Sequence, residues 1–576
     1  MFNSKSFRVL VSAITVLAML LVVSACGPAE QSPEPSGTTP GQGQGSETRG
    51  KTAIEVAKER GGKLVAHDGQ AFGNPNDPHL YATGTGRNFS VPVTEGILTR
   101  DTYDPANPIV AALAEKWEVS KDGKAYTFKL RQGIRFQNVA PVNGRELTSE
   151  DAKYSLLRLT ADSSVIVEKW KARFQRAAEF PKFKSIETPD KYTLVVNLEE
   201  PYAPFLDNIA HPGTLILPRE FVEKFPEKIV LEGMIGTGPF MPVEYRNQQI
   251  ASYKKNPDYW KKDAQGGQLP YLDEYQALYF ADAQTAVASF RSGQLDIAHP
   301  SGKTMMDTVK KDTPKTQTFM TPKASITTFR FNTKFKPFED VRVRRALSLV
   351  VDRQQFVDLV NQGVGVVSGP VTNPIFPDLA NTMDWLLSQP GYRYPKDQDI
   401  AEAKRLMKEA GYEKGFELQG LFTTGGTSGD LAALLGDHFK QLNITLKAEQ
   451  VDYAGQWVPR STNGEFEMSY MGHTVGTDVD SVLAVHTMTG GSRNYGKFSS
   501  PKLDDLVRKE QLATTLEERR KYAQEAEKII LEESPVIFVY TNSTLMIAQP
   551  WVHNVADGIV VGSYTNMVPN VWVEKH

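Results

Sequence analysis

A strand followed by an amphipathic helix lies near the middle of the chain, and it constrains the fold class more than any other segment. Residues 327–332 form a Thr- and Phe-rich run that is typical of a strand. Asp340 can cap the next helix by accepting a backbone N–H. Apolar side chains then recur at near-helical spacing with charged residues between them: Val343, Leu347, Val350, Val357 and Val360. The pattern predicts one helix over 341–360, packed on a sheet in an α/β fold.

The first residues have the pattern of a targeting segment. Lys5 and Arg8 supply positive charge, and residues 9–23 form an apolar run. This run is shorter than the roughly 20 apolar residues that a membrane-spanning helix needs. Cys26 follows Val23-Ser24-Ala25, which resembles the lipobox of bacterial lipoproteins, in which the Cys becomes the first mature residue and carries lipid. We expect a lipoprotein signal peptide over 1–25 and lipidation of Cys26.

A polar segment separates this leader from the rest of the chain. Residues 29–50 are mostly Gln, Ser, Pro, Gly and Thr and offer too little apolar surface to fold. We expect a flexible, lipid-anchored tether over 26–61. Cys26 is the only cysteine, which excludes a disulfide or a cysteine-based metal site within the chain.

The remaining residues have a globular composition, with 40% hydrophobic and 23% charged residues over the whole chain. Roughly 510 residues are too many for one hydrophobic core, so two or three domains are expected. Loss of residues 1–25 removes Lys5 and Arg8 and no acidic residue, which takes the net charge from −3 to −5. That balance gives no basic surface for nucleic acid.

Two alternating segments flank an Asp-Gly pair between residues 113 and 136, in the sequence LAEKWEVSKDGKAYTFKLRQGIRF. Asp122-Gly123 between two such runs predicts a β-hairpin. Residues 147–156 then read as the start of a helix that Thr148 or Ser149 can cap. Further fixed phrases follow, among them GTGPF at 236–240, NPDYW at 256–260 and SGQLDIA at 292–298.

These phrases, with FNT and PFEDVRVRRAL at 331–347, resemble the bacterial extracellular solute-binding proteins of the peptide/nickel class, family 5. The resemblance runs from about residue 62 to the C-terminus. It implies an α/β, periplasmic-binding-protein-like clamp of two lobes with an extra inserted domain, built from mixed sheets flanked by helices. The expected parts are lobe I (62–93 with 232–326 and 537–576), inserted domain II (94–231) and lobe II (327–536).

Motifs for chemistry are incomplete. Gly302-Lys303-Thr304 lacks the first Gly of a phosphate loop, because Ile297 stands there. Residues 84–86 lack the third Gly of a dinucleotide loop, and residues 426–430 lack the second Gly of a nucleophile elbow. His473 and His486 are too far apart for one helical face, and none of the nine His residues shows HExxH spacing. We expect no enzyme activity, no cofactor and no metal site.

The resemblance also directs attention to the stretch around residues 471–480. In peptide-binding members, an Asp shortly after a Gly-Trp pair meets the ligand's α-amine. An ungapped placement puts His473 in place of that Trp and Val475 in place of that Asp. A buried ammonium without a partner is costly, so free peptides are not the expected ligands. Asp478 and Asp480 remain as ligand contacts if the loop shifts, or they cap the turn before 481–483.

Other candidate ligand contacts are a polar group after Gly490-Gly491 and three aromatic residues. The polar group resembles the family's approach to the site and comprises Arg493, Asn494 and Tyr495. The aromatic residues can stack on a ligand or simply pack in a core, and they are Tyr81, Trp385 and Trp457.

The resemblance implies a substrate-binding lipoprotein of an ABC importer. It would capture a peptide-like or other polar solute between its lobes and deliver it to the permease subunits. We expect a monomer outside the cytoplasm, attached to the cell membrane through its lipid anchor only. A secreted hydrolase and a sensory surface protein on the same frame are the alternatives.

Overall fold

The computed structural model describes residues 54–68, 77–79, 87–104, 107–166, 174, 176–225, 234–246, 248–373, 375–476, 478–555 and 568–574, which lie in one unit spanning Gly50–His576. The expected signal peptide and Cys26 lie outside the described residues. Within the described part, no helix combines the length and the apolar character that crossing a bilayer requires.

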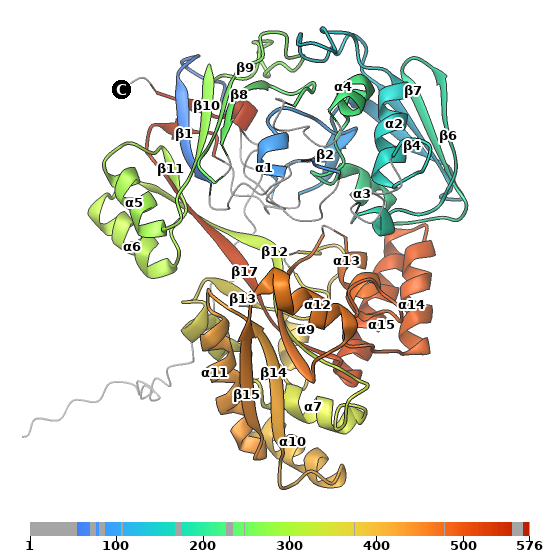
Figure 1. Ribbon diagram of the computed structural model, residues 1–576, viewed down its shortest axis with the longest axis vertical. Helices are drawn as coiled ribbons and strands as arrows, with labels where there is room; N and C mark the ends of the chain where they lie inside the picture. The colour runs from blue at the N-terminus through green and yellow to red at the C-terminus, as the bar shows by residue number, and fades with distance from the viewer. Residues whose placement is uncertain are drawn as a thin grey trace, which may run out of the picture. The chain divides into compact units, whose positions relative to one another are not determined.

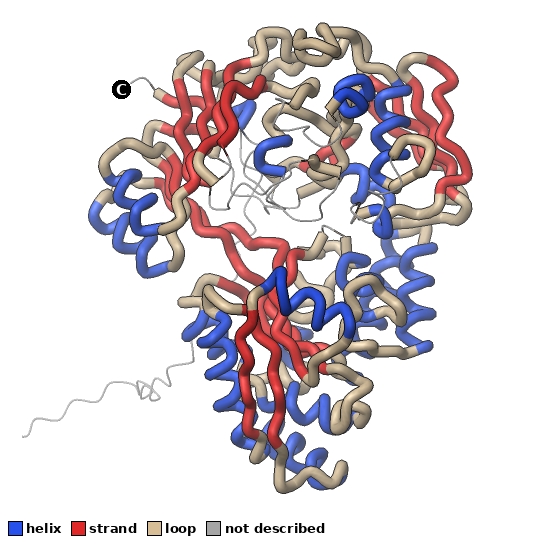
Figure 2. The backbone as a smooth tube through the Cα atoms, viewed as in Figure 1, coloured by secondary structure: helices blue, strands red, loops and turns tan. Residues whose placement is uncertain are grey.

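One mixed sheet runs through this unit (Figure 1). Its strands in order are β15 (Thr445–Val451), β14 (Glu417–Thr423), β16 (Met468–Thr474), β12 (Gln317–Phe331), β17 (Val536–Ala548), β11 (Ile297–Ala298), β1 (Lys63–Asp68), β10 (Glu274–Tyr279), β9 (Ile250–Lys255) and β8 (Phe240–Arg246), and β13 (Gly365–Val367) pairs with β17. The strands β12 and β17 lie in the middle of this order, and both run from one group of strands to the other (Figure 2).

The ladder between β12 and β17 divides the sheet into two halves. It pairs Gln317 with Ala548 at one end and Arg330 with Val536 at the other, and it is interrupted between Pro322 and Ile326. We call the half with β8–β11 and β1 lobe I, and the half with β14–β16 lobe II. These two long antiparallel strands therefore connect the lobes.

The remaining described strands form three smaller sheets: β4 (Ala114–Val119), β5 (Ala125–Leu130), β7 (Thr193–Leu198) and β6 (Phe183–Asp190); β2 (Leu98–Arg100) with β3 (Ile109–Ala111); and β18 (Val552–His553) with β19 (Trp572–Val573). The antiparallel pair β4–β5 confirms the hairpin at Asp122-Gly123. The next helix, α2 (Ser149–Leu159), has Thr148 as its N-cap, and Asp151 accepts the Thr148 N–H at 2.9 Å.

The other described helices are α1 (Arg87–Ser90), α3 (Phe205–Ala210), α4 (Arg219–Lys224), α5 (Ala283–Arg291), α6 (Lys303–Asp312), α7 (Val341–Val350), α8 (Arg353–Gln355), α9 (Met383–Ser388), α10 (Asp397–Glu409), α11 (Ser428–Phe439), α12 (Val458–Asn463), α13 (Asp480–Val482), α14 (Pro501–Leu512) and α15 (Leu516–Glu533). In lobe II, two apolar clusters cover opposite faces of the sheet. Ile537 and Val539 face the cluster under α7, α10 and α11, whereas Val536 and Phe538 face the cluster under α14 and α15.

The prediction of one continuous helix over 341–360 is wrong, because the helix is interrupted after Val350. Helix α7 ends at Val350, and Val351 is extended before a short helix that Asp352 caps through the Gln355 N–H. The break has a visible cause, since Arg353 is buried and donates to the backbone oxygens of Phe538 and Val351. Arg353 can reach these carbonyls only if the chain turns at this point.

Glu95 joins two of the fixed phrases, GTGPF at 236–240 and NPDYW at 256–260. Its carboxylate accepts hydrogen bonds from Tyr259 Oη at 2.9 Å, Trp260 Nε1 at 2.8 Å and Thr237 Oγ1 at 2.9 Å. Burial raises its pKa. A Cβ on Gly236 would lie 2.2 Å from the Val93 carbonyl oxygen, so only glycine allows this close approach.

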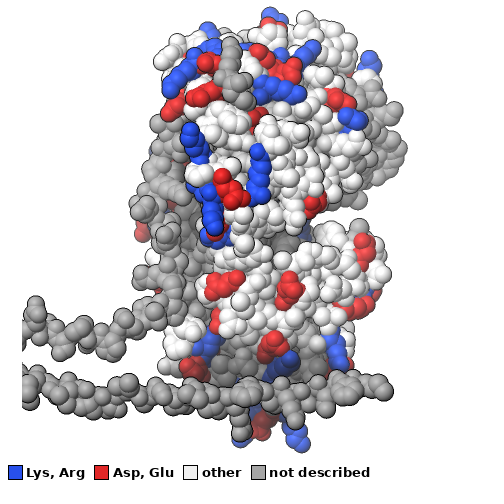
Figure 3. Space-filling view, turned by 90° about the vertical axis from the view of Figure 1, so that its left-hand side faces the viewer, with Lys and Arg blue, Asp and Glu red and all other residues white. Residues whose placement is uncertain are grey.

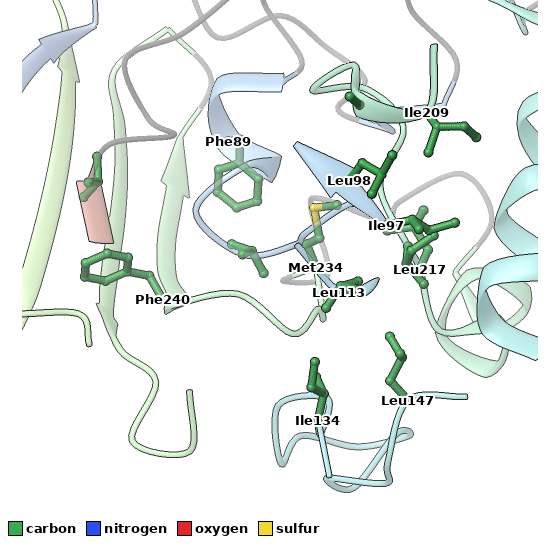
Figure 4. Close-up of a cluster of buried hydrophobic side chains, with 14 of the residues drawn as sticks. Phe89, Ile97, Leu98, Leu113, Ile134, Leu147, Ile209, Leu217, Met234 and Phe240 are labelled. Atoms are coloured by element: carbon green, nitrogen blue, oxygen red, sulfur yellow. The ribbon is translucent and has the colours of Figure 1, made fainter. Parts of the chain in front are cut away.

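The largest apolar cluster surrounds this junction and joins lobe I to the β4–β7 sheet. Figure 4 shows part of it, with side chains that come from several segments between Phe89 and Phe240 converging on one core. On the outer surface, basic and acidic side chains are interspersed over the face drawn in Figure 3. That distribution agrees with the small net charge of the chain.

Candidate functional site

Three strands of lobe I that point in the same direction, β1, β10 and β11, end on one edge of the sheet. Strand β1 is parallel to β10 and to β11, and β12 has the same direction as β11 because both are antiparallel to β17. In α/β proteins, ligands bind outside the carboxyl ends of such strands. The residues at these ends are His67 on β1, Phe280 after β10 and His299 after β11, and Lys323 lies within β12, where the first part of its ladder with β17 ends.

The two histidines at this edge form a contact pair. Their ring centroids lie 5.8 Å apart, and Phe280 contacts His67 edge-on at 5.6 Å. The His299 backbone N–H donates to His67 Nδ1, and the His299 ring lies 2.9 Å from the Leu545 carbonyl oxygen. Burial lowers the pKa of both histidines to about 4, so both imidazoles are neutral near pH 7.

Lys323 lies where the β12–β17 ladder is interrupted. Residues 323–325 have no partner on β17, and interruptions of this kind redirect side chains near functional sites. Burial lowers the pKa of the Lys323 ammonium, which in turn contributes to the lowered pKa of His299. Among the described residues, no carboxylate is hydrogen-bonded or ion-paired to Lys323.

Val475 is a direct neighbour of this interruption. Its backbone N–H donates to the Ala324 carbonyl oxygen at 2.9 Å, and its side chain is 2% exposed within the cluster under α14 and α15. His473 precedes it on β16, opposite Ile326. Residues 473–475, which the sequence pattern singled out, therefore lie next to the interrupted part of β12. Val475 is a core residue there.

Asp478 and Asp480 lie in a buried acidic cluster with Asp207 and Glu510. Arg519 is ion-paired to Asp478, to Glu510 at 2.6 Å and to Asp207 at 3.8 Å. Asp480 instead accepts hydrogen bonds from Tyr202 Oη at 3.1 Å and Gln511 Nε2 at 2.8 Å. Both candidate carboxylates therefore already have protein partners.

The cluster contains more acid than base, because Arg519 and Arg100 are the guanidiniums that pair with its four carboxylates among the described residues. Burial and the neighbouring Asp478 raise the pKa of Asp207 and of Asp480 to about 7. Burial also raises the pKa of Glu510. The cluster consequently changes charge close to neutral pH.

The same cluster joins lobe II to the segment that carries β4–β7. Tyr202 and Asp207 come from that segment, whereas Asp480 and Arg519 come from lobe II. Two further contacts lie alongside, namely the Ala203 N–H donating to the Gln511 carbonyl oxygen at 2.8 Å and an ion pair between Arg508 and Glu200. This contact region is separate from the two connecting strands.

The candidates near residue 494 have structural partners. Asn494 Nδ2 donates to the carbonyl oxygens of Met488 and Phe498, and Arg493 supplies a carbonyl oxygen to buried Arg330 at 2.8 Å. Arg330 also lies over the Tyr495 ring at 5.7 Å. These residues hold the segment 485–498 against β12 and β16.

The aromatic candidates do not meet at one place. Trp457 is buried between Tyr453 and Tyr495, at ring distances of 5.6 Å and 6.3 Å. Trp385 packs against the cluster under α7, α10 and α11, which is the opposite sheet face from Val475. Tyr81 lies outside the described residues.

Sequence reasoning missed His67, His299 and Lys323. A usable signal was present, because His67 and His299 each follow a short apolar strand run. Finding it required the knowledge that the two strands are parallel neighbours. Among the described residues, no group of three or more His, Cys, Asp or Glu side chains could hold a metal ion.

The chain matches the family described as "Bacterial extracellular solute-binding proteins, family 5 Middle" over residues 108–495. It is similar to heme-binding protein A of Haemophilus influenzae, with 27% identity over 547 residues that cover 91% of this chain and 93% of the relative. It is also similar to the dipeptide-binding protein of Escherichia coli, with 25% identity over 84% of this chain and 91% of the relative.

A solved structure confirms the fold. The ABC transporter-associated periplasmic binding protein DppA from Helicobacter pylori, in complex with the peptide STSA, superposes with a TM-score of 0.74 at 22% identity, covering 90% of this chain and 99% of that chain. The expected α/β binding-protein clamp is thus confirmed. Because the family match spans more than half of the chain, this protein belongs to the bacterial extracellular solute-binding proteins of family 5.

Proposed function

We propose that this protein is the solute receptor of an ABC importer, which captures a polar solute between lobe I and lobe II and delivers it to permease subunits. The family match over 108–495 is the observation that carries the proposal. The relatives are binding proteins by name, for heme and for dipeptides, and they favour neither a hydrolase nor a sensory protein. Because their named solutes differ, they leave the solute of this chain open.

The connection between the lobes supports capture by closure. Strands β12 and β17 link the lobes at one place, and the Tyr202–Asp480 and Ala203–Gln511 contacts form a second, separate place. A solute that touches both lobes stabilises the closed arrangement by its differential affinity. We assign the Tyr202–Asp480 and Ala203–Gln511 contacts to the closed arrangement. We also propose that lobe I comprises 62–93, 232–326 and 537–576, that the inserted domain II comprises 94–231, and that lobe II comprises 327–536.

The site region favours a solute other than a peptide with a free α-amine. Val475 offers no carboxylate, and Asp478 and Asp480 are engaged by Arg519, Tyr202 and Gln511. An ammonium placed beside Val475 would lose its hydration without gaining a charged partner from that side chain. A blocked peptide or a polar solute without that amine fits the available groups better.

Mass spectrometry of the small molecules released from denatured, freshly purified protein tests the receptor proposal. We expect a defined polar solute that rebinds to the emptied protein, and we expect X-ray scattering to give a smaller radius of gyration when it is bound. Unchanged solute after prolonged incubation is the expected control result. Progressive conversion to product would favour the hydrolase, and a protein that neither carries nor rebinds any solute would contradict the receptor proposal.

We further propose that Cys26 carries the membrane anchor. The Cys26→Ser variant is expected to move from the membrane fraction to the soluble extracytoplasmic fraction, because acyl chains contribute about 0.8 kcal/mol per buried CH₂ and serine cannot be thioether-linked to lipid. Ser24→Ala is a matched control that should stay membrane-bound. Membrane retention of the Cys26→Ser variant at the wild-type level would contradict the anchor.

A further inference from the structure

The buried acidic cluster lies across the contact between lobe II and the segment that carries β4–β7. Asp207 is on α3 in that segment, whereas Asp478 precedes α13 in lobe II. The guanidinium of Arg519 on α15 contacts both carboxylates, Asp207 at 3.8 Å and Asp478 at a shorter distance. In Figure 1, α3 lies close to the lobe II helices α13 and α14. Carboxyl groups from the two sides of this contact therefore share one cation.

The cluster holds more negative charge than its cations balance. Among the described residues, four carboxylates meet two guanidiniums, which leaves an excess of two negative charges when every acid is ionised. The carboxylates are Asp207, Asp478, Asp480 and Glu510, and the guanidiniums are Arg100 and Arg519. The oxygens Asp480 Oδ1 and Glu510 Oε2 are buried and accept no hydrogen bond from any described residue. Since buried, unpaired charge is costly, this contact favours binding of a proton.

The groups that face the carboxylates come from both sides of the contact. They are Arg100 on β2, Tyr126 on β5, Tyr202 before α3, Gln511 on α14 and Arg519 on α15. Burial and the charge of Asp478 raise the pKa of Asp207 and of Asp480 to about 7, although the guanidiniums oppose this rise. Separating the two sides would admit water and move Asp207 away from Asp478. Both pKa values would then fall toward the ordinary aspartate range.

We propose that closure of the clamp takes up a proton into this cluster, so that the receptor holds its solute more tightly in acid than in alkali. This inference rests on the receptor function and the closed arrangement proposed above, and it adds a means of regulation. The proton comes from water and binds a carboxylate oxygen of Asp207 or Asp480. On Asp207, the resulting O–H can donate to Asp478 across the contact.

The direction of the effect follows from the higher carboxyl pKa in the closed arrangement. The contribution to closure is fully present below about pH 4 and is lost as the pH rises through about 7. For one proton, the closing equilibrium should change on the order of 10- to 30-fold between about pH 5.5 and about pH 8.5. Solute affinity should change by a similar factor, because the solute binds the closed arrangement.

Spin labels on the two sides of the contact measure closure directly. Lys121 in the β4–β5 turn and Lys502 on α14 are exposed, and they lie on opposite sides. The turn is close to lobe II, since a Cβ on Gly123 would lie 3.4 Å from Thr514 Cγ2. Labels are attached to Lys121→Cys and Lys502→Cys in a Cys26→Ser background, which removes the only native cysteine.

Pulsed electron–electron double resonance then gives the ratio of short-distance to long-distance molecules. The samples are emptied protein alone and emptied protein with a sub-saturating amount of the small-molecule fraction released from heat-denatured wild type. We expect the ratio to rise on the order of 10- to 30-fold in both samples when the pH falls from about 8.5 to about 5.5. Because the emptied sample contains no solute, its response cannot arise from titration of the solute.

Two variants locate the proton. The double variant Asp207→Asn with Asp480→Asn leaves two carboxylates for two guanidiniums, so its ratio should be nearly independent of pH. Asp505→Asn is the matched control, because Asp505 is an exposed carboxylate on α14 that pairs with Lys509, and it should keep the wild-type response.

A wild-type ratio that is the same at both pH values, with and without the released fraction, would overturn the inference, and this measurement does not depend on the folding of any Asn variant. A full pH response in the folded double variant would also overturn it. The receptor function fails separately, if the released fraction does not increase the short-distance molecules at either pH.

Discussion

The Arg519→Met variant is expected to lose about 3–5 kcal/mol of unfolding free energy at neutral or higher pH, the cost typical of removing one partner from a buried ion pair. Arg519 is buried and balances Asp478, Glu510 and Asp207, so its loss leaves carboxylates without a cation. Urea denaturation of wild type and variant, followed by tryptophan fluorescence, measures the difference. Methionine keeps most of the side-chain volume, which separates the charge effect from a packing effect.

Arg520→Met is the matched control, because Arg520 is the next residue on α15, is exposed and donates to a backbone carbonyl oxygen only. It should cost no more than about 1 kcal/mol, as for an exposed hydrogen bond. Equal stability of the two variants would show that the acidic cluster does not depend on Arg519.

The buried acidic cluster around Arg519 determines the direction in which the stability of the fold changes with pH. Asp207 and Asp480 have a folded-state pKa of about 7, above the ordinary aspartate value of 3.8. A raised carboxyl pKa means that the folded state binds the proton more tightly, so this contribution is fully present below about pH 4 and is lost as the pH rises through about 7. The Arg519→Met variant should therefore show a steeper fall in stability over this range than wild type, and added Asp480→Asn should flatten it.

The Glu95→Ala variant is expected to lose about 3–5 kcal/mol of unfolding free energy. The substitution removes the acceptor of three hydrogen bonds, and each buried donor left unsatisfied costs about 1–3 kcal/mol. The donors are Tyr259 Oη, Trp260 Nε1 and Thr237 Oγ1. Because Trp260 is one of them, its fluorescence should also report the local change.

Two variants bracket this expectation. Glu95→Gln keeps a carbonyl oxygen and should lose clearly less than Glu95→Ala, whereas Glu115→Ala removes an exposed carboxylate on β4 and should be close to neutral. If Glu95→Ala proves no more destabilising than Glu115→Ala, Glu95 does not hold the GTGPF and NPDYW phrases together.

Local features of the fold could be predicted from the sequence. The Asp122-Gly123 hairpin and the helix that begins after Thr148 both appear in the structure. Each depends on neighbours along the chain, such as turn residues, caps and apolar periodicity. The break at Val351 escaped this reasoning, because it depends on Arg353 reaching Phe538, a contact 185 residues away.

The candidate site was harder to predict for the same reason. The stretch around Val475 was singled out from a sequence pattern, and the structure shows it beside the lobe connection. His67 and His299 are 232 residues apart and meet only because β1 and β11 are parallel neighbours. Likewise, the partners of Asp478 and Asp480 come from helices and loops that no local pattern links to them.

The position of β17 in the sheet has a consequence for the order in which the chain folds. This strand is among the last segments of the chain, yet it lies between β12 and β11 in the middle of the sheet. Its pairings with these strands are non-local, and contacts of this kind slow folding because a long loop must close first. A growing chain can therefore form the β4–β5 hairpin early, but it can unite its two lobes only after residue 548 has been added. Until β17 has been added, the edges of β11 and β12 stay open to mispairing.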